Sequence, residues 1–146
     1  MITRLRSAGI WISSGRILLE SLADREIWGI PGGFVESSES VEQACTREYI
    51  EEIGLKMRCI RLAIIHENFW TDSGQSVREY GYYFIVKPAG DLGPCPTIQS
   101  QEGHLKFRWY PLSELGSLIF VPPHLKNWLP SLPDDTLFLS TREDLS

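Results

Sequence analysis

Residues 33–55 read GFVESSESVEQACTREYIEEIGL, and this stretch predicts one helix with a loop at each end. Ser40 is a typical N-cap residue, and Gln43 three residues later completes a capping box. Gly54 ends the helix, because glycine readily adopts the left-handed conformation that follows a helical C-terminus. We therefore expect the helix between Ser40 and Gly54.

The acidic side chains of this helix lie where an apolar stripe should continue. The residues that mark the inward face, at helical spacing, are Val41, Ala44 and Cys45. The same stripe next reaches Glu48 and Glu52, and Glu51 is a neighbour of both. Half-buried like charges are costly unless a cation compensates them, and a hard divalent cation prefers oxygen ligands. The alternative is a solvated, glutamate-rich helix, which is the more common case for such a helix alone.

The composition limits the class of protein. With 146 residues, 42% hydrophobic and 23% charged, we expect a single domain, 1–146, with its own core. The net charge of −5 without a basic run argues against nucleic acid polymers and membrane surfaces as partners. An anionic ligand remains compatible, because a bound metal reverses the local field. Three cysteines without a CxxC pair favour a reduced, cytoplasmic compartment.

Strand patterns lie on both sides of the helix. The expected strands cover 2–12, 16–22, 26–30, 55–67, 77–87, 105–110 and 132–139. Short helices are expected from Pro111, with Ser113 as cap, and over 121–129, and a frayed tail from Ser140. Loops are expected over 68–75 and 88–101. The pattern predicts a mixed sheet between helices, an α/β or α+β domain.

Two glycines precede the helix. Pro31-Gly32-Gly33 follows a short strand, and we expect this pair of glycines to allow positive φ and close approach to a ligand.

Residues 33–55 resemble the Nudix box, usually written G-x5-E-x7-R-E-U-x-E-E-x-G-U. Every charged and glycine position of that pattern is matched. The one departure is Tyr49, where the family prefers an aliphatic residue, and we expect repacking there without loss of chemistry. The flanking segments 28–33 and 108–115 also resemble the family. This context favours the metal site over the solvated helix.

The resemblance to MutT-like Nudix hydrolases implies a fold and an activity. The fold is an α/β/α sandwich with a mixed β-sheet and a loop–helix–loop that binds Mg²⁺ or Mn²⁺. The activity is hydrolysis of a pyrophosphate (phosphoanhydride) bond in a nucleoside diphosphate derivative or nucleoside triphosphate. The implied metal ligands are Glu48, Glu51, Glu52 and the Gly33 carbonyl. The implied structural residues are Glu39, paired with Arg47, and Gly54.

The general base stays open between the box and a later loop glutamate. Glu51 and Glu48 are the candidates in the box, and Glu102, after the long loop, is the candidate outside it.

Three aromatic residues are candidates for stacking on a small-molecule nucleotide: Trp28, Phe69 and Trp70. The last two occupy the expected loop 68–75, where a second copy of the chain, in a homodimer, is an equal alternative to a nucleobase.

Two other functions are alternatives on the same fold. A non-catalytic nucleotide-binding or regulatory module usually loses the acids of the box, whereas this chain keeps them. An isoprenoid diphosphate isomerase needs a catalytic cysteine, and Cys45 on the inward face is poorly placed for that role.

Overall fold

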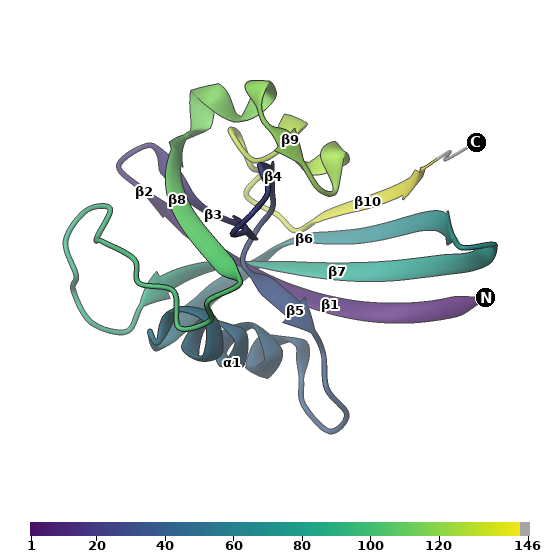
Figure 1. Ribbon diagram of the computed structural model, residues 1–146, viewed down its shortest axis with the longest axis horizontal. Helices are drawn as coiled ribbons and strands as arrows, with labels where there is room; N and C mark the ends of the chain where they lie inside the picture. Colours follow the sequence, from purple (N-terminus) through teal and green to yellow (C-terminus); the bar gives the residue numbers. More distant parts are fainter. Residues whose placement is uncertain (144–146) are drawn as a thin grey trace.

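The computed structural model describes residues 1–143, and a five-stranded mixed sheet forms its centre (Figure 1). In sheet order the strands are β10 (Leu137–Arg142), β6 (Met57–Asp72), β7 (Gln75–Pro88), β1 (Ile2–Ile10) and β5 (Gly32–Phe34). β10 runs parallel to β6, and β1 runs parallel to β7, whereas the other two pairings are antiparallel. The predicted mixed sheet is confirmed.

A smaller sheet packs beside the large one. Its strands are β2 (Ile12–Ser13), β3 (Arg16–Leu22) and β8 (Leu105–Pro111), and a separate pair joins β4 (Ile27–Trp28) to β9 (Ile119–Phe120). The consecutive residues Ile17, Leu18 and Leu19 of β3 are all fully buried. Because adjacent strand residues face opposite ways, β3 must be covered on both sides.

Helical segments cover the two faces of the large sheet (Figure 1). α1 (Val41–Ile53) lies on one face, where Tyr49 and Ile53 pack against Phe84 and Val86. The 3₁₀ helices η1 (Leu112–Ser117) and η2 (Pro123–Asn127) lie on the other, where they close a second apolar cluster. The α/β class is thus confirmed.

The second helical layer differs from the expectation in its geometry. The segments from Pro111 and over 121–129 form the 3₁₀ turns η1 and η2 instead of α-helices, and Ser113 makes no capping bond. Both segments are short and begin at proline, so they gain little from α-helical hydrogen bonds. Within residues 1–143, no helix is long and apolar enough to cross a bilayer.

The hairpin between β6 and β7 is longer than predicted. The expected loop 68–75 is mostly strand, and only Ser73 and Gly74 form the turn, with φ of 50° and 80°. Two consecutive residues with positive φ match the right-handed twist of the strands. Phe69 and Trp70 therefore lie on a strand, and the expectation of a loop tip was wrong.

The last strand also continues beyond its expected end. β10 reaches Arg142, so residues 140–142 are paired with β6 instead of frayed, and residues 144–146 of the expected tail lie outside the described residues.

Gly32 and Gly33 are glycine for a reason other than the predicted positive φ. Both lie in β5 with ordinary extended backbone. A β-carbon on Gly32 would come 2.3 Å from the carbonyl oxygen of Ser7, and one on Gly33 would come 2.4 Å from Oε1 of Glu48. The close approach is therefore to the chain's own backbone and to an acidic side chain of α1.

Candidate active site

The ends of α1 are set by local contacts. The Ser40 hydroxyl accepts a hydrogen bond from the Gln43 amide at 3.0 Å, and the Gln43 side chain accepts one from the Ser40 amide at 2.8 Å. Gly54 has a φ of 77°, and its amide donates to the carbonyls of Tyr49 and Ile50. The predicted capping box and the glycine stop are both present, so the helical phase places Tyr49 in the core.

Arg47 joins the helix to the loop that precedes it. Its Nη2 and Nε donate to the two carboxylate oxygens of Glu39 at 2.8 Å and 3.0 Å, and Nη2 also donates to the Phe34 carbonyl. This two-point ion pair lowers the pKa of the Glu39 carboxyl. The Arg47–Glu39 pair implied by the family resemblance is therefore present in the structure.

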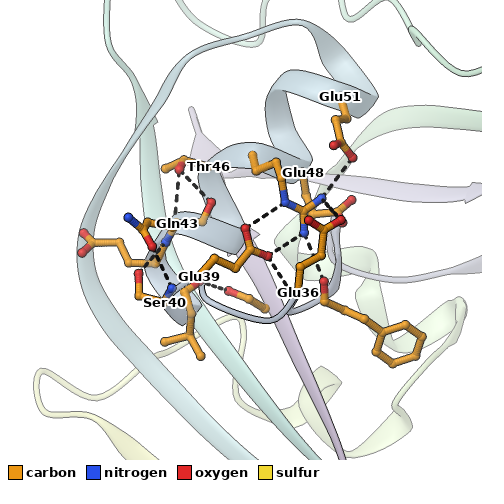
Figure 2. Close-up of polar contacts among 12 residues, drawn as sticks. Glu36, Glu39, Ser40, Gln43, Thr46, Glu48 and Glu51 are labelled. Atoms are coloured by element: carbon orange, nitrogen blue, oxygen red, sulfur yellow. Dashed lines mark hydrogen bonds and ion pairs between the residues drawn. The ribbon is translucent and has the colours of Figure 1, made fainter.

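The same guanidinium also holds two acids of the helix. Its Nη1 donates to Glu48 at 3.0 Å and to Glu51 at 3.1 Å, and Figure 2 shows Glu39, Glu48 and Glu51 gathered around it. The side chain of Glu48 is 14% exposed, whereas that of Glu51 is 49% exposed. Within residues 1–143, no three acidic, histidine or cysteine side chains stand as a ready-made metal cage.

Glu52 lies deeper than the other two acids and has an acidic neighbour from another element. Glu52 is 4% exposed, and burial together with the neighbouring Glu20 carboxyl raises its pKa to about 11. Burial also raises the pKa of Glu20 on β3, although Arg6 on β1, 3.6 Å away, opposes the increase. One oxygen of each carboxyl, Oε2, has no hydrogen-bond partner.

Sequence reasoning missed Glu20 and Arg6. Each occupies an ordinary polar position in a strand, and their distance from the helix in the chain hides the contact. Only the packing of β1 and β3 brings them to Glu52.

A cavity of about 410 Å³ begins at these residues. It lies between the large sheet and the β3–β4 region, and Arg6 and Glu20 are part of its wall. Its other polar lining residues include Arg25, Asn68 and Glu79, and Trp70 is its aromatic side chain. Glu20, the neighbour of Glu52, therefore borders a cavity that carries the guanidinium groups of Arg6 and Arg25 and the carboxylates of Glu79 and Glu143.

The three aromatic candidates have different positions. Trp70 lines the cavity, whereas Phe69, its neighbour on β6, lies between Arg78 and Arg142 at 5.0 Å and 4.6 Å. Adjacent strand residues point to opposite faces, so the two rings cannot serve one ligand.

Trp28 belongs to the core. It is 1% exposed and packs edge-on against Tyr110 at 5.0 Å. Because both faces of its ring are covered, Trp28 offers no platform for a base in this structure, contrary to the expectation.

Glu102 lies at the far end of the long loop, near the end of α1. The amide of Gln101 donates to the carbonyl of Glu52 at 2.7 Å, so the loop docks on the last turn of the helix. The Glu102 carboxylate is 3.4 Å from Nε2 of His104 and is partly exposed. The structure thus brings the segment of Glu102 to the helix that carries the acids.

Residues 3–132 match the family model described as NUDIX domain. The chain belongs to the Nudix family. Among its Nudix relatives, it is 29% identical over 103 residues to a putative 8-oxo-dGTP diphosphatase 3 of Mycobacterium tuberculosis, covering 69% of this chain and 45% of the relative. It is also 29% identical over 107 residues to an uncharacterized Nudix hydrolase of Bacillus subtilis, covering 73% and 65%. The chain spans less than two thirds of the length of these two relatives.

Solved structures agree with this Nudix assignment. The crystal structure of a MutT protein from Bacillus halodurans has a TM-score of 0.75 and 20% identity, over 97% of this chain and 91% of that one, and shows the shared fold. The solution structure of the E. coli ORF135 protein has a TM-score of 0.65 and 25% identity, over 88% and 87%.

Proposed function

We propose that this Nudix chain is a hydrolase, dependent on Mg²⁺ or Mn²⁺, that cleaves a phosphoanhydride bond in a nucleoside diphosphate derivative or nucleoside triphosphate. One observation carries the proposal. Glu20 and Glu52 are buried together, each with a carboxyl oxygen that has no partner, and Glu20 lines a cavity that also holds Arg6 and Arg25. Two buried carboxyls this close cannot both ionise without a compensating cation, and a pyrophosphate ligand requires positive charge.

The acidic residues fit a divalent metal. Mg²⁺ binds carboxylate and carbonyl oxygens, and the unpartnered oxygens of Glu20 and Glu52 are such donors. Glu48, Glu51, Glu52 and the Gly33 carbonyl would hold the ion, with Glu20 as a further acid. When bound, the ion neutralises phosphate charge and lowers the pKa of a bound water.

Arg47 positions two acidic side chains of α1. It holds Glu48 and Glu51 through one Nη1 and anchors the preceding loop through Glu39. This arrangement keeps the two helical carboxylates close together.

The cavity supplies the contacts for substrate. Arg6 and Arg25 present guanidinium groups, which bind phosphate oxygens, and Trp70 presents an apolar ring.

Three glutamates are candidates for the general base. Glu51 is the most exposed of them, Glu48 packs against Gly33, and Glu102 follows the end of the loop that docks on α1. A carboxylate that takes a proton from the attacking water contributes about 10²–10⁴-fold to the rate.

A non-catalytic nucleotide-binding module is the second candidate. It would bind through the same cavity, but it would gain nothing from an acidic cluster that is costly to bury. The retained acids therefore favour hydrolysis. The three free cysteines support a reduced, cytoplasmic setting as part of the same proposal.

The test is an activity screen with Mg²⁺ over nucleoside triphosphates, nucleotide sugars, ADP-ribose and dinucleoside polyphosphates. Phosphate, pyrophosphate and nucleoside monophosphate are measured separately. Glu51→Gln and Glu52→Gln should each lower kcat by about 100-fold or more with an unchanged circular dichroism spectrum. Glu42→Gln, at an exposed acid of the same helix, is the matched control and should retain activity.

Wild-type rates in both variants would refute the assignment, and tight binding without turnover would favour the binding module. A large loss of kcat in Glu102→Gln, with metal binding intact, would identify the loop glutamate as the base.

A further inference from the structure

Two polar side chains stand side by side on the cavity wall. Asn68 of β6 and Glu79 of β7 are direct partners in the antiparallel register, and both line the cavity. Residues directly opposite each other project from the same face of a sheet, with β-carbons about 4.5–5.5 Å apart. The cavity therefore contains an amide next to a carboxylate.

The orientation of the Asn68 amide is held by a hydrogen-bond chain. Asn68 is 4% exposed, and its Oδ1 accepts a hydrogen bond from the Thr141 hydroxyl of β10 at 2.7 Å. Thr141 Oγ1 also lies 2.6 Å from Nε2 of His66. Because the hydroxyl donates its single proton to Asn68, it accepts from His66, and the Asn68 oxygen is engaged. The amide nitrogen Nδ2 is then the group left for the cavity.

A donor beside an acceptor complements one kind of nucleobase edge. Guanine, hypoxanthine, uracil and thymine have a carbonyl oxygen next to a ring N–H, whereas adenine and cytosine have an amino group next to a bare ring nitrogen. We propose that Asn68 donates to the carbonyl and Glu79 accepts from the ring N–H, so that the cavity selects nucleotides of oxo bases. This inference rests on the proposed function insofar as the cavity holds the nucleotide.

The rest of the cavity has the layout that a nucleotide needs. Trp70, two residues after Asn68 on β6, projects from the same face and offers a surface for the base. Arg4 and Arg6 of β1 are aligned with Glu79 and Gly81 of β7, so Arg6 lies on the neighbouring strand and about 7 Å farther along it than the level of Glu79. The part of the cavity that would hold the nucleobase, at Asn68 and Glu79, is thus separate from the part next to Glu20.

Glu79 has two arginines nearby on β1. Burial raises the pKa of its carboxyl, Arg6 and Arg4 oppose the increase, and Glu143 adds to it.

Binding of monophosphates tests the inference without hydrolysis. Isothermal titration calorimetry with Mg²⁺ compares IMP with AMP, whose bases differ only at this edge, and UMP with CMP. We expect IMP and UMP to bind about 10–100-fold more tightly than their counterparts, the discrimination of a good bidentate base contact. Equal affinities, a preference for AMP, or no binding of any of the four up to millimolar concentration would overturn the inference.

Variants separate a specific contact from general packing. Asn68→Leu keeps the branching of the side chain but removes the amide, so IMP and AMP should bind alike. Thr141→Val should weaken the preference for IMP over AMP, because the Asn68 amide is no longer held in place. Thr141→Ser, which keeps the hydroxyl, should retain the preference. Ser140→Ala is the control, because that hydroxyl donates to Glu67 at a position facing the other way, and its preference should equal that of the wild type. Equal weakening of both nucleotides in Asn68→Leu would indicate packing alone and overturn the inference.

Hydrolysis of ITP and ATP then distinguishes the two proposals. A binding preference for IMP without turnover of either triphosphate would contradict the proposed hydrolase only. Turnover of both triphosphates with equal binding of IMP and AMP would contradict the base selection only.

Discussion

The ring of Tyr49 occupies the space that a side chain on residue 9 would need. A β-carbon on Gly9 would lie 2.5 Å from Cε2 of Tyr49, and the Tyr49 hydroxyl donates to the Gly9 carbonyl at 2.7 Å. Tyr49 is the one position where the chain departs from the Nudix pattern. A residue without a side chain on β1 thus accommodates a larger residue on α1.

Gly9→Ala should therefore destabilise the protein by about 1–3 kcal/mol, because the added methyl group overpacks a closed core. Tyr49→Leu removes the obstructing ring at its own cost, so the double variant should be more stable than the sum of the single changes predicts. Urea unfolding of the four proteins measures this coupling. Strict additivity would show that the two residues do not compete for one space.

Gly32→Ala and Gly33→Ala should have opposite consequences. The methyl group in Gly32→Ala meets the fixed backbone of Ser7 and Ala8, so we expect loss of several kcal/mol of stability, on the order of 3 kcal/mol. In Gly33→Ala the nearest atoms are those of the carboxylate end of Glu48, a side chain that can move away. That variant should fold with nearly normal Tm but lose about 10-fold or more in kcat/KM, since Glu48 is displaced.

Thermal unfolding and steady-state kinetics on the same preparations check both outcomes. Normal activity in Gly33→Ala would show that the position of Glu48 is not critical.

Glu52→Gln should stabilise the protein in EDTA. It removes a buried acid that lies against Glu20 and has an unpartnered oxygen, and we expect a gain of about 1–2 kcal/mol in the free energy of unfolding. Mg²⁺ should raise the Tm of the wild type through preferential binding to the folded state, and this increase should be absent from the variant. An equal Mg²⁺-dependent increase in Tm in both proteins would argue against Glu52 as a ligand.

The stability of the protein should fall in mild acid because of His66. Burial and the neighbouring His124 lower the pKa of His66 from 6.5 to about 4, so the unfolded chain takes up its proton first as the pH falls. The stability contributed by neutral His66 is complete above pH 6.5 and is lost between about pH 6.5 and 4, at a cost of about 3 kcal/mol.

In His66→Gln, the free energy of unfolding should decrease over this pH range by less than in the wild type, and the difference should equal that amount. Chemical denaturation at several pH values measures it. Parallel stability curves for the two proteins would rule out His66 as the group responsible.

Predictions from sequence were most accurate where the contacts are local. The limits of β3 and the caps of α1 were correct, because apolar runs and capping bonds depend on residues a few positions apart. Residues 68–72 were misassigned as loop, because polar residues and the glycine at the turn obscured a strand that pairing with β7 stabilises. Trp28 was misjudged for a related reason, since nothing in its neighbours in the chain shows that Tyr110 and β9 cover it.

The sequence by itself determined the acidic helix. The spacing of Glu48, Glu51 and Glu52 and the ends of α1 follow from helical periodicity and capping, which act over one or two turns. Only the tertiary structure decided that Glu20 and Arg6 join Glu52, and that Thr141 orients Asn68 across a sequence separation of 73 residues. Those contacts depend on which strands pair and in which register, and no local pattern encodes that pairing.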